Sequence, residues 1–433
     1  MRRGFGVLVI TMVLSGLPRA QSFDNFERGR ARDILHTIAD DVRKNYYDPK
    51  MHGFDFEGRL RDADEKLKQA TTLSQAMSTI AWVLDGLDDS HTYFIPPSRT
   101  TRTEYGWRMQ MIGDHCYVTH VRPKSDAEAK GLKPGDEILN VDGIVPDRNN
   151  FATMEYIVNI LFPRAGMHLQ VRGVDGQVRK VDVMAKIRQL QKLVDLTSDL
   201  GFWNLIREQQ NADRLVRTRC ADVGKDLEIC KMPDFELSEE KVHEVLGLAK
   251  KRKGLILDLR DNPGGSVVTL GQMVGGFFDH EIKIGDRVGR KPMKPQVAKG
   301  QHDPFTGDLV VLVDSNSASA AELFARVMQL EKRGKIVGDR SAGLVMEGKI
   351  FDHKAGANTV VFYAVMVTDA DVVMTDGQSL ERRGVTPDEV LLPSAADLAS
   401  GRDPVMAHAT EMLGVKMSPE EAAKLFPYEW PKE

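Results

Sequence analysis

From residue 24 onward, apolar side chains recur every three or four positions, as at Ile34, Ile38 and Val42. Such spacing lines up one apolar stripe along a helix. A Pro-Pro pair at 96–97 then interrupts the chain, because proline cannot continue a helix. The pattern predicts an N-terminal helical domain over residues 24–100.

The pattern changes near residue 105 to short apolar runs separated by glycine turns. Cys116–Val121 and Ile138–Val141 each have the length and composition of a strand, and Asp142-Gly143 is a pair typical of a tight turn. A helical pattern covers 151–161. Together these features predict a small β domain over residues 105–187.

Beyond residue 217, apolar runs alternate with helical patterns. The predicted strands are 254–259, 309–313 and 336–338, and the predicted helices are 267–278 and 320–331. This alternation implies right-handed crossovers and a largely parallel sheet covered by helices. The predicted core domain spans residues 217–395, preceded by a helical linker or insertion at 190–216 and followed by a helical tail at 396–433. The predicted fold class is therefore a multidomain α/β protein.

The first residues have the pattern of an export signal. Arg2 and Arg3 precede an apolar run from Phe5 to Leu17, which is shorter than the roughly 20 residues that a membrane span needs. We expect a signal peptide over residues 1–20 and an exported protein, periplasmic or extracellular, without stable membrane insertion after cleavage. An uncleaved anchor is the alternative.

Composition narrows the class of protein. The 433 residues suggest about three domains. A hydrophobic share of 42% and a charged share of 28% exclude wholesale disorder. The net charge of −4 argues against a nucleic-acid partner bound by phosphate neutralisation. The histidines and cysteines show no metal-binding spacing, so neither a metal nor another cofactor is predicted. The oligomeric state stays open.

The cysteines have two candidate roles. Cys220 and Cys230 flank a predicted hairpin whose turn lies at Gly224-Lys225, so antiparallel pairing would bring them close together. An oxidising compartment would permit a disulfide between them, whereas two half-buried thiols are the alternative. Cys116 lies in an apolar strand pattern and is expected in the core.

Two loops carry candidate chemistry, and each follows a predicted strand. The loop from Asp258 to Gly265 ends in two glycines, which let the backbone turn and present N–H groups to a ligand. The loop from Asp314 to Glu322 places Ser319 at the start of a helix. That serine is either a helix cap or a nucleophile whose reacting anion lies at the positive end of the helix.

The predicted β domain resembles a PDZ domain of exported bacterial proteases. The resemblance lies in residues 127–136, a short helix followed by Gly-Leu-Lys-Pro-Gly-Asp, and in the strand and turn at 138–143. PDZ domains bind an extended peptide as an added strand. Their carboxylate-holding loop carries a Gly-apolar-Gly signature, from which the segment 106–113 departs. Peptide capture and a purely structural role therefore both stay open.

The two loops together resemble those of the C-terminal processing (tail-specific) serine peptidase family. The matching segments are Asp-Leu-Arg-x-Asn-Pro-Gly-Gly at 258–265, Ser-Ala-Ser-Ala-Ala-Glu at 317–322, Gly-Asp-Arg-Ser-Ala-Gly at 338–343 and Gly-Val-Thr-Pro-Asp at 384–388. The resemblance implies a crotonase-like α/β catalytic core that hydrolyses peptide bonds in protein or peptide substrates. By this match Ser319 is the nucleophile. The N–H of Ala320, with that of Gly264 or Gly265, would form the oxyanion hole.

The general base is where the sequence departs from one branch of the family. Members with a Ser-Lys dyad carry lysine 25 positions after the serine, where this chain has Leu344. Lys349 lies five residues further on, over ~15 Å away along an extended strand. The chain is closer to the branch that resembles the catalytic core of tricorn protease. That branch uses Ser-His, supported by a glutamate, which implies His91 as base with Ser90 and Glu381 orienting it.

Two readings of this constellation stay open. An exported serine endopeptidase that cuts extended or C-terminal segments would use the side chains of Ser319, His91, Ser90 and Glu381. A catalytically inactive relative would bind extended peptides or apolar ligands through the same fold, and the missing lysine favours it. In that case His91 has no catalytic task and Glu381 is an ordinary surface carboxylate.

Overall fold

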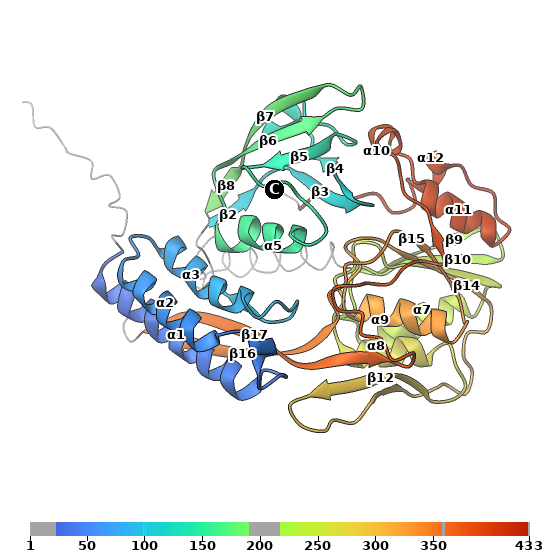
Figure 1. The fold of residues 1–433 in the computed structure, drawn as a ribbon. Coiled ribbons are helices and arrows are strands. Elements are labelled where there is room, and N and C mark those ends of the chain that lie inside the picture. The colour runs from blue at the N-terminus through green and yellow to red at the C-terminus, as the bar shows by residue number, and fades with distance from the viewer. Residues whose placement is uncertain (1–22, 98, 100, 190–216, 357–359, 432–433) are drawn as a thin grey trace, which may run out of the picture.

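A computed structural model describes residues 23–97, 99, 101–189, 217–356 and 360–431. Figure 1 shows three parts: N-terminal helices, a small β domain and a larger α/β part. The predicted signal peptide and the predicted linker at 190–216 lie outside the described residues. None of the described helices is both long and apolar enough to cross a membrane.

Three helices form the N-terminal part. Each begins at a side chain that accepts a backbone N–H of its first turn, from Asp24, Asp55 and Thr72 respectively. Their apolar stripes face one another and bury residues such as Ile34 and Ile80. The helical elements are α1 (Asn25–Asn45), the 3₁₀ turn η1 (Met51–Gly53), α2 (Phe56–Lys68) and α3 (Leu73–Asp85).

The small β domain is a five-stranded antiparallel sheet in the order β3-β4-β5-β6-β7. Its strands are β3 (Trp107–Ile112), β4 (His115–Val121), β5 (Glu137–Val141), β6 (Gly166–Arg172) and β7 (Val178–Met184). The helices are α4 (Asp126–Ala129), α5 (Phe151–Tyr156) and the π-turn η2 (Ile157–Leu161), while β2 (Thr101–Glu104) pairs with β8 (Lys186–Gln189). Cys116 is buried in this domain's core, as predicted. Strand β3 forms one edge of the sheet.

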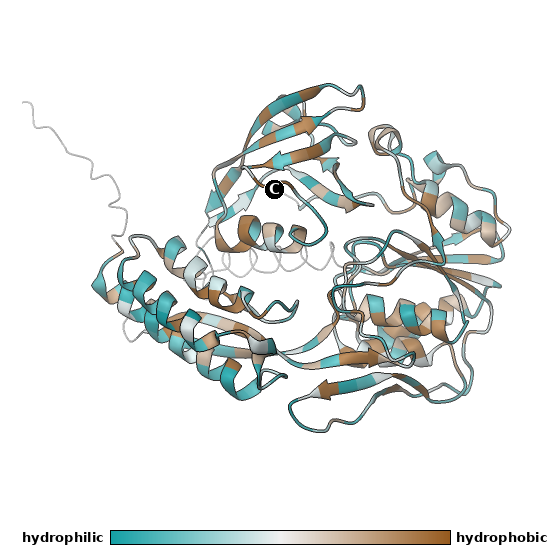
Figure 2. Ribbon diagram, in the orientation of Figure 1, coloured by the Kyte–Doolittle hydropathy of each residue, from teal (hydrophilic) through white to brown (hydrophobic). Residues whose placement is uncertain are grey.

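The large part contains the predicted, largely parallel sheet. Its six strands are ordered β18-β15-β14-β11-β10-β9, and only the pair β10–β9 is antiparallel. The strands are β9 (Arg219–Val223), β10 (Leu227–Lys231), β11 (Gly254–Asp258), β14 (Asp308–Val313), β15 (Lys335–Gly338) and β18 (Glu389–Val390). Helices α7 (Glu239–Ala249), α8 (Val267–Gly275) and α9 (Ala320–Leu330) pack on it. In Figure 2 this part is largely brown, whereas α1 and α2 are mostly teal.

The structure also contains a second sheet, which has antiparallel strands and was not expected from the sequence. With this sheet and that of the small β domain, most strand pairs among the described residues are antiparallel. The strands of the second sheet are β1 (Tyr93–Ile95), β12 (Ile282–Gly289), β13 (Gln296–Ala298), β16 (Met346–Ala355) and β17 (Val361–Met374). The hairpin β16–β17, orange in Figure 1, runs from the large part to lie beside α1. One end of β17 pairs with β1 and the other with β12. The helical part and the large part therefore share one strand.

The C-terminal tail begins with short helices and ends against the small β domain. These helices are α10 (Ala395–Ser400), α11 (Pro404–Met412) and α12 (Pro419–Ala422). The Tyr428 ring then lies over the His120 ring at 4.2 Å, and Arg122 donates to the carbonyl of Pro431 at 3.0 Å. The tail thus links the large part to the small β domain.

A disulfide joins the two strands of the predicted hairpin. Cys220 on β9 lies directly opposite Cys230 on β10, and the two sulfurs are bonded. Of the two readings of these cysteines, the structure has the disulfide. Such a bond stabilises mainly by restricting the unfolded chain.

Reduction of this disulfide is expected to lower the free energy of unfolding by about 3 kcal/mol, as for closure of a short loop. Mass spectrometry after alkylation, with and without reductant, will count the thiols, and denaturant titration will measure the change in stability. A Cys220→Ser/Cys230→Ser double variant should unfold at the same midpoint with and without reductant. Two alkylatable thiols at these positions in the untreated protein would contradict the bond.

Candidate active site

Ser319 lies on the sharp turn between strand β14 and helix α9. Its backbone has φ +52° and ψ −118°, a conformation that non-glycine residues rarely adopt and that is held only when the surroundings enforce it. The side chain is half-buried, and its hydroxyl donates no hydrogen bond to a described residue. The turn therefore presents a hydroxyl whose proton is not engaged, at the N-terminus of an eleven-residue helix.

The loop after β11 lies directly against this turn. A Cβ atom added to Gly264 would come within 2.6 Å of the Ser319 Cβ and 2.9 Å of the Ala320 nitrogen. Gly264 also has φ +97°, so both the space and the backbone conformation require glycine there. The carbonyl of Asn262 accepts the N–H of Ala318 at 2.9 Å, which ties the two loops together.

Two backbone N–H groups remain available beside Ser319. The N–H of Gly264 donates to the Asn262 side chain at 2.8 Å and is therefore occupied. Within the described residues, the N–H groups of Gly265 and Ala320 have no acceptor. Ala320 is the first residue of α9, where the helix dipole favours negative charge. Of the three predicted donors, Gly265 and Ala320 are the pair that can bind an oxyanion.

Glu322 holds the turn at Ser319 in place through its side-chain carboxylate. The sequence interpretation assigned this residue no role. Its buried carboxylate accepts the N–H groups of Ser319 at 3.0 Å, Gly343 at 2.8 Å and Leu344 at 3.0 Å, and also the Ser341 hydroxyl at 2.5 Å. Burial raises the pKa of Glu322 to about 7, against the lowering effect of these bonds. The Ser-x-x-Glu spacing at 319–322 is a capping-box signal that could have indicated this contact.

The other three predicted side chains form one hydrogen-bonded chain. The Ser90 hydroxyl donates to Glu381 Oε2 at 2.9 Å and lies 2.7 Å from His91 Nδ1. Because the single hydroxyl proton goes to Glu381, His91 Nδ1–H must be the donor to Ser90. Glu381 Oε1 also accepts the N–H of Ser90 at 2.9 Å. This arrangement leaves His91 Nε2 unprotonated, the form in which it can accept a proton.

One peptide group connects this chain to Ser319. The carbonyl of Leu344 accepts the N–H of Ser319 at 2.9 Å, and the N–H of Val345 donates to Glu381 at 2.8 Å. These two groups belong to the same peptide bond. Among the described residues, no hydrogen bond joins the His91 imidazole to the Ser319 hydroxyl. The two halves of the site are therefore connected through the Leu344–Val345 peptide and not by a direct hydrogen bond.

Comparison with known proteins places this arrangement in a family. The model of peptidase family S41 matches residues 227–391, and that of the PDZ domain matches residues 96–171. Residues 227–391 thus have the sequence of a peptidase family S41 domain. The protein is a serine-type peptidase with a PDZ domain, which the small β domain forms.

Relatives of known name agree with this assignment. A carboxy-terminal-processing protease of Bartonella bacilliformis is 29% identical over 395 residues, which cover 84% of this chain and 82% of the relative. A carboxyl-terminal-processing protease of Picosynechococcus is 23% identical, with 89% of this chain and 88% of the relative covered. Among solved structures, mature CPAF superposes with a TM-score of 0.64 at 16% identity and covers 87% of this chain and 95% of its own. That structure shows the shared fold.

The two positions considered for a lysine base place no lysine side chain beside Ser319. Leu344, at the position of the dyad lysine, contributes only its backbone to the site. Lys349 lies on the hairpin strand β16, where its exposed side chain is paired with Asp369.

The environment of His91 favours its neutral form. Desolvation lowers the pKa of His91 to about 4, and the nearby Asp89 carboxylate opposes this shift. Burial raises the pKa of Glu381, while its hydrogen bonds to Val345 and Ser90 act in the other direction. The imidazole is therefore uncharged across the neutral pH range.

The PDZ domain touches the loops that carry the site. Gln110 on β3 donates to the half-buried Asp314 at 2.6 Å, and Ser315 donates to the carbonyl of Met111 at 2.5 Å. Asp314 in turn accepts the N–H groups of Asp261 and Ser317. The contacts of β3 thus reach both the loop before Ser319 and the loop before Gly264.

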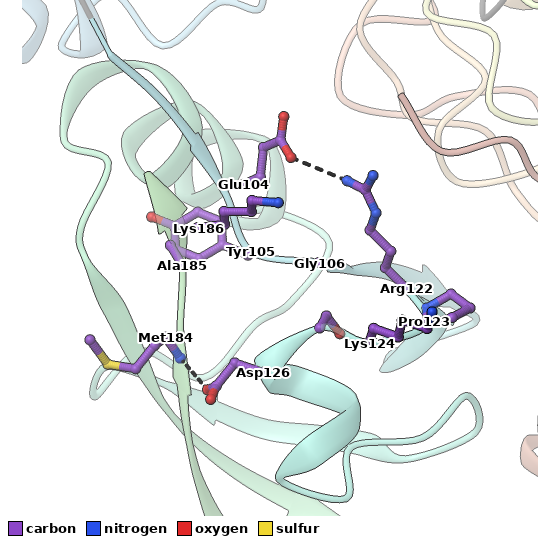
Figure 3. Close-up of a pocket in the computed structure, with 11 residues that line it drawn as sticks. Glu104, Tyr105, Gly106, Arg122, Pro123, Lys124, Asp126, Met184, Ala185 and Lys186 are labelled. Atoms are coloured by element: carbon purple, nitrogen blue, oxygen red, sulfur yellow. Dashed lines mark hydrogen bonds and ion pairs between the residues drawn. The ribbon is translucent and has the colours of Figure 1, made fainter. Parts of the chain in front are cut away.

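No metal site accompanies these residues in the part of the chain that the structure describes. The only clustered ligand set there contains Cys220 and Cys230, which are bonded to each other. His115 pairs with Glu137 and His120 contacts Tyr428, so the two histidines have separate partners. A cavity of about 490 Å³ lies on the PDZ domain away from Ser319, between Tyr105, Lys124 and Met184 among others (Figure 3).

Proposed function

We propose that this peptidase is an exported endopeptidase that cuts extended or C-terminal segments of proteins through an acyl-enzyme on Ser319. The observation that carries the proposal is the hydrogen-bonded chain from Glu381 through Ser90 to His91, joined to Ser319 by the Leu344–Val345 peptide. The hydrogen-bonded chain leaves one imidazole nitrogen of His91 unprotonated and therefore able to accept the proton of Ser319.

The geometry supports a standard order of events. His91 Nε2 takes the Ser319 proton as Oγ attacks the peptide carbonyl, and the N–H groups of Gly265 and Ala320 stabilise the oxyanion. The imidazolium then donates its proton to the leaving amine, which completes the acyl-enzyme. A water molecule, activated by the same nitrogen, hydrolyses the ester and restores the hydroxyl. For this step a closing movement must first bring Nε2 within hydrogen-bond reach of Oγ.

The substrate class rests on weaker support. Relatives are named for carboxyl-terminal processing, and PDZ domains bind an extended peptide as an added strand. Export rests on the pattern of residues 1–20. The net charge gives no support for a nucleic-acid partner.

An inactive, peptide-binding relative is the second candidate. Two observations favour it: Leu344 replaces the dyad lysine, and no hydrogen bond joins His91 to Ser319. Such a protein would bind extended peptides or apolar ligands without cleaving them.

Labelling with a fluorophosphonate decides between the two candidates. We expect the mature protein to react at Ser319, identified by peptide mass spectrometry, and to cut a reduced, alkylated protein into new fragments. Labelling without cleavage would show an activated serine that lacks this substrate. An unlabelled protein between pH 5 and 9 that still binds peptides would support the inactive relative.

A further inference from the structure

We propose that Asp89 is a positioning residue for His91: its carboxylate anchors the turn 89–92 to strand β17 and thereby sets where the imidazole stands. This inference rests on the proposed function, because it assigns a role to the residue that holds the proposed base. Neither the sequence motifs nor the hydrogen-bonded chain through Glu381 requires Asp89.

One oxygen of Asp89 binds three donors. Asp89 Oδ1 accepts the N–H of His91 at 2.9 Å, the N–H of Thr92 at 2.8 Å and the hydroxyl of Thr368 at 2.6 Å. The first two bonds close the turn around His91. The third crosses to another part of the chain, 279 positions away. Charged acceptors form stronger bonds than neutral ones, so this oxygen dominates the local geometry.

Thr368 makes the anchor specific. Thr368 is fully buried, and its N–H donates to the Thr92 hydroxyl at 3.1 Å. The Thr92 hydroxyl also lies 3.1 Å from the Thr368 hydroxyl. The Thr368 carbonyl accepts the N–H of Tyr47, which follows helix α1. Thr368 therefore forms hydrogen bonds both with the turn 89–92 and with the segment that follows α1. These bonds fix the position of the helical part on β17.

A bulge in the β16–β17 hairpin places Gly348 next to both Thr368 and His91. The β16–β17 register shifts beside Gly348, which pairs with Thr368. A Cβ atom on Gly348 would lie 3.3 Å from the His91 Cβ. Asp89, Thr368 and Gly348 together thus fix the position of His91 from two sides.

Asp89 also supplies charge next to the imidazole. The titratable groups around this turn include Asp89 itself, Glu381 through Ser90, and Arg382, whose guanidinium lies 3.9 Å from Glu381. The hydroxyls of Tyr46 and Tyr47 also face Asp89, and burial together with the Asp89 charge raises the pKa of both. Of these, the Asp89 charge raises the pKa of His91 against the effect of burial. The same charge would stabilise the imidazolium that forms when His91 takes a proton.

The chain offers a matched control one residue away. Asp88 carries the same carboxylate, but its side chain is 87% exposed and pairs with Arg382 at the surface. Replacing Asp88 by asparagine removes one negative charge from the same turn without touching the anchor. Comparison of Asp89→Asn with Asp88→Asn therefore separates a local effect from a change in net charge.

The experiment compares wild type with Asp89→Asn, Asp89→Ala, Thr368→Val and Asp88→Asn. It measures the second-order rate of fluorophosphonate labelling, kcat and KM for a peptide substrate, and the pH profile of kcat/KM. We expect Asp89→Ala to lower labelling and kcat by about 100-fold, as for a misplaced catalytic group, with KM unchanged. Asp88→Asn should stay within about twofold of wild type, as expected for a surface change.

The pH profile distinguishes positioning from mere structure. Asparagine keeps an oxygen acceptor but removes the charge, so Asp89→Asn should move the acid limb of kcat/KM to lower pH, and Asp88→Asn should not. Thr368→Val keeps the volume but removes the crossing bond, and it should lower kcat with an unshifted acid limb.

Two results would overturn the inference while leaving the proposed function intact: folded Asp89 variants that label at the rate of Asp88→Asn, or equal acid limbs in Asp89→Asn and wild type. If Asp89→Ala does not fold, Asp89→Asn and Thr368→Val give the decision by the same criteria. Failure of the proposed function would look different, because wild type would then not label at Ser319 or Ser319→Ala would still label.

Discussion

Replacement of Ser319 by alanine is expected to lower peptide hydrolysis by roughly 10⁶-fold and to abolish fluorophosphonate labelling. Ser319 supplies the hydroxyl next to the N–H groups of Gly265 and Ala320, which have no acceptor among the described residues. Residual hydrolysis would have to come from oxyanion stabilisation of a water attack alone. Labelling stoichiometry and product analysis by mass spectrometry measure both effects.

Ser394→Ala is the control for this loss. It removes a hydroxyl that caps the surface helix α10, so it should cost about 1 kcal/mol of local stability and leave labelling unchanged. Full hydrolysis by a folded Ser319→Ala variant would refute the assignment of the nucleophile.

Replacement of His91 by alanine is expected to slow labelling and acylation by about 10²- to 10⁴-fold, the usual contribution of a general base. Wild-type kcat/KM should rise with pH through a midpoint near 4, because burial lowers the pKa of His91 to about 4 and only the neutral imidazole accepts a proton. An unperturbed histidine would give a midpoint near 6.5. Steady-state rates between pH 3 and 8 measure the profile.

The lowered pKa of His91 also makes the stability of the folded protein depend on pH. In the unfolded chain His91 takes a proton near pH 6.5, whereas the folded protein resists protonation down to about pH 4. The contribution of His91 to stability is therefore present above pH 6.5 and is lost as the pH falls through this window.

Lys349→Met is the variant that tests the competing assignment of the base. Strong loss of labelling in Lys349→Met, together with full labelling in His91→Ala, would transfer the role of base to Lys349.

Much of the fold followed from local patterns. The strands β11, β14 and β15 were predicted because each is a short apolar run, and the helices after β11 and β14 because helical patterns alternate with these runs. The hairpin that holds Cys220 and Cys230 was predicted because its turn and its two strands are contiguous. The predicted helix at 151–161 is confirmed over its whole length, with a π-helical end from Ile157, whereas the predicted helix at 267–278 was too long because it ends at Gly275.

The unexpected elements depend on contacts between distant segments. The segment at 93–95 was expected to be helical but is strand β1, because β17 offers it an open edge. The hairpin β16–β17 was missed because its apolar positions face α1 at one end and the catalytic core at the other. The domain boundaries drawn from the sequence stay predictions.

The candidate site divides along the same line. Ser319 and its glycine loop could be found from sequence, since both lie where neighbouring parallel strands end. The meeting of Ser90 with Glu381, 291 positions apart, could only be inferred from resemblance. The anchoring of Asp89 by Thr368 left no sequence signal, because it depends on a bulge in a hairpin that was not predicted.

The shared strand β17 determines which pieces of this chain can be produced on their own. Residues 217–395 alone would lack β1 and the helices that cover Tyr363, Val365 and Val367. An uncovered apolar edge of this kind is a template for aggregation. The N-terminal helices alone would in turn lose the surface on which they pack. The helical part and the catalytic core therefore make one cooperative folding unit, and truncation between them yields insoluble material rather than a smaller enzyme.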